Sequence, residues 1–120
     1  MKLVLTLLVA SLSATIATLA LAHAHLDRAQ PASGSVVRES PRELALWFTQ
    51  RLEPAFSRVS VVDERDQRVD NDDARVDAGD PKVLRVSLRK LAYGTYRVKW
   101  RVLSVDTHVS EGDFAFDVAP

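Results

Sequence analysis

The sequence contains no cysteine. Disulfides are therefore excluded even if the chain is exported, and so are thiol nucleophiles and metal sites built from thiolates. An excess of one charge is also missing, because 16 lysines and arginines balance 16 aspartates and glutamates, and the charged residues are scattered. Nothing in this balance favours nucleic acid or an anionic membrane surface as a partner.

Charged side chains are absent from the first part of the chain, where none follows Lys2 until Asp27. The apolar stretch ends on Ala20-Leu21-Ala22, a small-x-small pattern that signal peptidases accept. We expect residues 1–22 to be a signal peptide that is cleaved after Ala22, so that the exported, periplasmic protein begins with His23. An uncleaved membrane anchor is the alternative, because the apolar run approaches the roughly 20 residues that span a bilayer.

Residues 23–120 would remain after cleavage, which is 98 of the 120. That length suits one domain with a modest core and leaves no room for a second. We expect this domain to be a monomer that is stabilised by packing alone.

No window of useful length has helical periodicity, whereas alternation of apolar and polar residues recurs along the chain. The clearest case is the segment 95–102, whose odd-numbered positions 97, 99 and 101 are all cationic. The alternation predicts strands at 43–48, 57–63, 83–88, 95–102 and 111–118, with a mostly irregular segment at 69–81 that includes a short edge strand at 74–76. We therefore expect an all-β, Ig-like Greek-key sandwich or barrel of about seven strands.

Several residues with chemical potential have plainer interpretations. Tyr96 follows a glycine turn and opens a strand, which is typical of the tyrosine corner of Greek-key sandwiches. Trp100 alternates with charged residues and is expected in the core. The cationic row of Arg97, Lys99 and Arg101 is expected to be a solvated sheet face, and Asp70, Asp72, Asp73 and Asp77 a solvated loop without the spacing of a calcium site.

The three histidines are His23, His25 and His108. A histidine at the mature terminus offers its free α-amine and its imidazole to one metal ion in a closed ring, and both groups lose their protons near neutrality at modest cost. On an extended backbone, the spacing of Asp106 and His108 points both side chains the same way. Three nitrogens and one carboxylate oxygen suit copper(II) better than zinc.

Further motifs follow one another in order, at Pro31 to Ser35, Leu44 to Thr49, Gly79 to Pro81, Gly94 to Val102, and Ser104 to His108 with Gly112 beyond. With the terminal histidine, they make residues 23–120 resemble the CopC family of periplasmic copper-resistance proteins. The resemblance implies a Greek-key fold in which His23, Asp106 and His108 bind one copper(II) ion. It also implies a non-enzymatic buffer or carrier of copper, with an inner-membrane partner of the CopD type.

The sequence departs from the family pattern in two places. Some members hold copper(I) in a methionine-rich loop, but the single methionine here is Met1, which would be lost with the signal peptide. Some members place a glutamate near the copper(II) site where this chain has Gln50, to which we assign no metal role.

Three alternatives remain open from the residues alone. His23-Ala24-His25 could wrap copper(II) through the amine, two backbone amides and the imidazole of His25. A copper-dependent oxidative enzyme, similar to lytic polysaccharide monooxygenases, would also use a terminal histidine. A metal-free adhesion or assembly sandwich would make all three histidines incidental.

Overall fold

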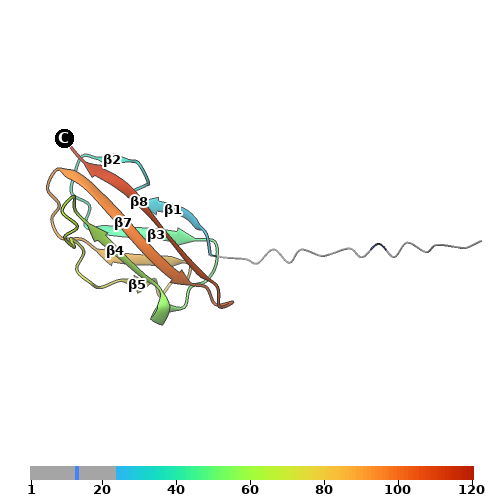
Figure 1. Cartoon of the computed structure of the whole chain (residues 1–120). Coiled ribbons are helices and arrows are strands. Elements are labelled where there is room, and N and C mark those ends of the chain that lie inside the picture. The colour runs from blue at the N-terminus through green and yellow to red at the C-terminus, as the bar shows by residue number, and fades with distance from the viewer. Residues whose placement is uncertain (1–12, 14–23) are drawn as a thin grey trace, which may run out of the picture.

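The computed structural model describes residue 13 and residues 24–120. Two four-stranded sheets face each other, one in the order β1-β3-β6-β5 and the other in the order β2-β8-β7-β4 (Figure 1). Only β5–β6 and β7–β8 follow each other within one sheet, and every other connection passes to the opposite sheet. This connectivity confirms the expected all-β sandwich.

The strands lie where the alternation predicted them, with additions at the start of the chain. Their bounds are β1 Leu26–Gln30, β2 Val36–Val37, β3 Glu43–Phe48, β4 Arg58–Val62, β5 Arg75–Val76, β6 Val83–Ser87, β7 Gly94–Leu103 and β8 Val109–Val118. Eight strands are therefore present where the sequence predicted about seven, and β1 and the two-residue β2 both precede the first strand that the alternation predicted. The described helical structure is one 3-10 turn, Pro54–Phe56, and no helix among the described residues is long and apolar enough to cross a membrane.

The core lies between the two sheets and is built by the alternation of β3, β4, β7 and β8. Leu44, Leu46 and Phe48 point inward from β3, and Val59 and Val61 meet them from β4. Each of these side chains contributes about 1.5–3 kcal/mol when fully buried. Such packing must hold a domain that has no disulfide.

Tyr96 forms the expected corner, because its hydroxyl donates to the carbonyl of Ala92 at 2.6 Å. Trp100 is inward-facing as predicted but only partly buried, packing edge-on against Phe48 at a centroid distance of 5.1 Å. The cationic side chains of Arg97, Lys99 and Arg101 are exposed on the opposite face of β7.

The expectation of a solvated aspartate loop was wrong for Asp70, which is 1% exposed. Its carboxylate accepts hydrogen bonds from the Arg68 guanidinium at 2.8 Å and from the Val61 amide at 2.8 Å. Burial opposes ionisation of Asp70, but these donors and the Asp72 amide outweigh it and hold its pKa below the usual range. Asp70 therefore anchors the loop to β4, and nothing in the local sequence marks that contact.

Candidate metal site at one end of the sandwich

Asp106 and His108 lie on the tight loop that joins β7 to β8. Leu103 and Val109 form the last strand pair, and the Thr107 amide donates to the Ser104 carbonyl at 2.9 Å to close the turn. Within this loop the Asp106 Oδ1 and the His108 Nδ1 are 3.3 Å apart. Donor atoms about 2.0 Å from a shared ion lie roughly 3 Å apart, so the pair fits two neighbouring positions around one metal ion.

The loop is fixed from inside by Ser104, which is 0% exposed. Its Oγ donates to the carboxylate of Asp106 and accepts the His108 amide at 3.3 Å. The Ser104 hydroxyl and then His108 hold the pKa of Asp106 below its usual range. Asp106 is thus an anion at neutral pH and is oriented before any metal arrives.

The loop contains a strained residue between the two candidate ligands. Thr107 has a φ of 72°, in the left-handed region that a β-branched residue rarely adopts. Its hydroxyl donates to the Asp106 carbonyl at 2.6 Å, which offsets part of the cost. Strain of this kind persists where the surrounding contacts over-determine the conformation, and here those contacts set the directions of Asp106 and His108.

The beginning of the described chain is fixed at the end of β3. The Thr49 amide donates to the His25 carbonyl at 2.9 Å, and the His25 amide donates to the Thr49 Oγ1 at 2.9 Å. Ala24 is fully buried in the core cluster. The backbone around residue 25 therefore continues the pairing of β1 with β3.

Residues 49–53 connect this beginning of the chain to the β7–β8 loop. Two residues beyond Thr49, the Arg51 carbonyl accepts the Val105 amide at 3.0 Å, and Leu52 forms an isolated bridge with Ser104. Two extended residues span at most about 7 Å, so residue 25 and the loop meet the same short segment. The start of β1 and the β7–β8 hairpin loop lie at the same end of the sandwich in Figure 1.

The structure brings together Asp106 and His108 of the three residues singled out from the sequence. His23 lies outside the described residues, so its position relative to that pair stays a prediction. Within the described part of the chain, no group of three or more histidine or acidic side chains is arranged to hold a metal ion. Sequence analysis missed the positioning roles of Ser104 and Thr49, although both lie in quoted motifs, because their partners are set by the fold.

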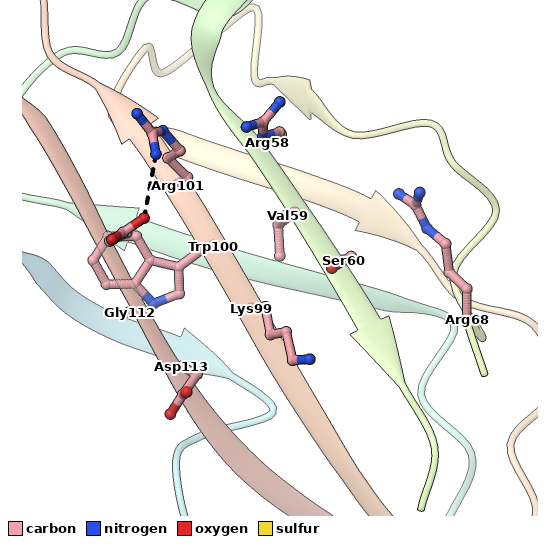
Figure 2. A pocket seen from close by; sticks show the side chains of 10 residues that line it. Arg58, Val59, Ser60, Arg68, Lys99, Trp100, Arg101, Gly112 and Asp113 are labelled. Carbon is pink, nitrogen blue, oxygen red and sulfur yellow. Dashed lines mark hydrogen bonds and ion pairs between the residues drawn. The ribbon is translucent and has the colours of Figure 1, made fainter. Parts of the chain in front are cut away.

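A separate hollow of about 560 Å³ lies on the outer face of β4 and β7. Figure 2 shows Arg58, Lys99 and Arg101 around it on these two neighbouring strands. Arg101 is paired with Glu111 at 3.5 Å. The residues that line this hollow include no histidine, so it is distinct from the candidate metal site.

Fold and loop together define a class: an all-β sandwich that presents a carboxylate and an imidazole at one end. The CopC domain family matches residues 26–119. The chain belongs to the CopC family.

Similar proteins and solved structures support membership of the CopC family. Protein YobA of Escherichia coli (strain K12) is 34% identical over 98 residues, covering 81% of this chain and 79% of its own. Copper resistance protein C of Pseudomonas syringae pv. tomato is 32% identical over 109 residues, covering 86% of each chain. The crystal structure of CopC from Methylosinus trichosporium OB3b has a TM-score of 0.76 at 38% identity, covering 82% of this chain and 95% of that one.

A relative of a different length is the copper transport protein CutJ of Bacillus subtilis (strain 168). It is 26% identical over 98 residues, which are 81% of this chain but 18% of CutJ. A segment similar to this chain is therefore a small part of that longer protein.

Proposed function

We propose that the protein is exported, loses residues 1–22, and binds one copper(II) ion in the periplasm through His23, Asp106 and His108. The amine and imidazole of His23 supply two nitrogens, His108 a third, and Asp106 an anionic oxygen. The bound ion is cargo, and the protein buffers or carries it without acting on a substrate.

The observation that carries this proposal is that the backbone at His25 and the β7–β8 loop both contact residues 49–53. Thr49 holds His25, two residues beyond His23, and Arg51 holds the loop of Asp106 and His108. The proposal then requires the amine of residue 23 to lie within the reach of two residues of chain from this contact, at most about 7 Å. Membership of the CopC family and the name of the Pseudomonas relative support copper as the ion.

A membrane partner completes the proposed role. CutJ is named a copper transport protein and contains a segment similar to this chain in 18% of its length. We expect this chain to deliver copper to, or receive it from, a separate CopD-like transporter of the inner membrane, working as a monomer.

The test compares the chain that begins at His23 with a chain that carries one extra residue before it. The extra residue converts the terminal amine to an amide, so copper(II) affinity should fall by more than the 10–100-fold typical of losing a group that only supports a ligand. Isothermal titration measures the affinity, and electron paramagnetic resonance counts the nitrogen donors.

His25→Ala is the matched control, since it changes a neighbouring histidine that has no role in the proposed set. It should leave affinity nearly unchanged. Equal affinity of the extended and unextended chains would exclude ligation by the amine, and absence of binding by the unextended chain would exclude the copper function.

A further inference from the structure

The two residues that follow the proposed terminal ligand are each fixed by a contact with the folded domain. Ala24 is 0% exposed and belongs to the core cluster. His25 is paired with Thr49 through two hydrogen bonds of 2.9 Å, one step beyond the register pair of Leu26 with Phe48. The segment after residue 23 is therefore extended along the end of β3.

One of the two bonds is made by a side chain. The Thr49 amide donates to the His25 carbonyl, as in an ordinary antiparallel pair. The His25 amide, in contrast, donates to the Thr49 hydroxyl. The identity of residue 49 therefore matters at this position, because valine or alanine would offer no acceptor.

The nitrogen held by Thr49 is one that a competing copper mode requires. A planar chelate of residues 23–25 takes the backbone nitrogens of Ala24 and His25 as ligands together with the His25 imidazole. That arrangement must curl the segment around the ion, break the bond to Thr49 and draw the buried methyl group of Ala24 out of the core. Both costs oppose the chelate.

We propose that Thr49 determines which donors reach copper: by holding the His25 amide, it keeps residues 24 and 25 extended, so that the ion completes its coordination with Asp106 and His108. This inference rests on the proposed copper(II) function. Thr49 is a positioning residue, since its hydroxyl accepts the His25 amide and acts on the ion through the conformation of residues 24 and 25.

The contact can be removed without disturbing the other half of the site. Arg51, which holds the Val105 amide, uses its backbone carbonyl, and Thr49 keeps its own amide bond to His25 in any variant. Thr49→Val deletes the hydroxyl and preserves the side-chain shape. Thr95→Val is the matched control, because it removes a threonine hydroxyl that donates to Asp117 at 2.7 Å, at the end of β7 far from the β7–β8 loop.

The experiment records electron paramagnetic resonance and visible spectra of chains that begin at His23, each loaded with one equivalent of copper(II). Wild type, Thr49→Ser and Thr95→Val should share one spectrum. Thr49→Val should gain a second component with more nitrogen donors and absorption at shorter wavelength, its population rising up to about tenfold for the loss of one hydrogen bond. The double variant Thr49→Val with His25→Ala should lose that component.

Three outcomes overturn the proposal: a Thr49→Val spectrum equal to wild type, a second component that persists without His25, or a wild type that already has the second component. Hydrogen exchange of the His25 amide without copper separates this inference from the proposed function. Slow exchange in wild type and Thr49→Ser but fast exchange in Thr49→Val supports the role of Thr49 in holding the segment, and equal rates overturn it. A wild type that binds no copper would instead overturn the proposed function.

Discussion

Ser104 orients both candidate ligands of the β7–β8 loop, Asp106 and His108. It is fully buried, its hydroxyl donates to Asp106, and its oxygen accepts the His108 amide. Both candidate ligands on the loop therefore depend on one side chain. Groups that orient ligands in this way typically change metal affinity by 10–100-fold when they are removed.

We predict that Ser104→Ala lowers copper(II) affinity about tenfold, at the lower end of that range, because Asp106 and His108 remain but are less fixed. Competition with a chelator measures the change. Ser87→Ala is the control, since the Ser87 hydroxyl also bonds an aspartate, Asp73 at 2.6 Å, but on the other sheet. Equal affinities of the two variants would show that Ser104 does not position the ligands.

Sequence spacing predicted the pair of Asp106 and His108 because both lie in one short loop, where local geometry decides direction. It could not predict Thr49 or Ser104, since Thr49 meets a residue 24 positions away and Ser104 acts from a buried position that only the folded hairpin creates. Asp70 was misassigned for the same reason. Its partners on β4 and at Arg68 are set by how the loop folds back.

At the scale of elements, the β7–β8 hairpin determines how the loop is presented. Its ten pairs run from Gly94 with Val118 to Leu103 with Val109. Gly112 lies opposite Trp100 on the inner face, and Figure 2 shows the indole beside it. A Cβ at residue 112 would lie 2.6 Å from Trp100 Cζ2, so the hairpin needs glycine there.

We predict that Gly112→Ala destabilises the fold by about 1–3 kcal/mol, the usual cost of overpacking, because the Trp100 ring must move against Phe48. Thermal or denaturant unfolding measures this free energy. Gly79→Ala is the control, since its Cβ would have only Asp77 Oδ2 at 3.4 Å and little should change. Adding Trp100→Leu to Gly112→Ala should recover part of the loss, and strictly additive effects would contradict the proposed clash.

Alternation was sufficient to predict β3, β4, β6, β7 and β8, because alternate residues of each strand are buried against the core. It failed to separate β1 and β2 from the surrounding segment. β1 buries little of its own surface, with no residue of the strand fully buried, and β2 has two residues. Such strands are defined by the neighbours they pair with, β3 and β8, rather than by their own pattern.

For the whole molecule, the proposed site makes copper a stabilising ligand. Binding to the folded state alone raises stability by about 2.7 kcal/mol when free ligand is 100 times Kd. For a domain of this size that corresponds to a rise in Tm of roughly 10–20 °C. Calorimetry of the chain beginning at His23, with and without copper(II), should record this rise.

His108→Ala should remove most of the rise in Tm, because one ligand of the loop is lost. His25→Ala should retain it. A shift of the same size in His108→Ala would mean that copper stabilises the protein from elsewhere.

Because the backbone at His25 and the β7–β8 loop both contact residues 49–53, the proposed site also implies an order of events. A ligand set drawn from residue 23 and from residues 106 and 108 is incomplete while the chain is still being synthesised. Under the proposed processing it stays incomplete until residues 1–22 are removed. Export, trimming and folding would each have to precede the first encounter with copper. The precursor would then remain empty in the compartment where it is made.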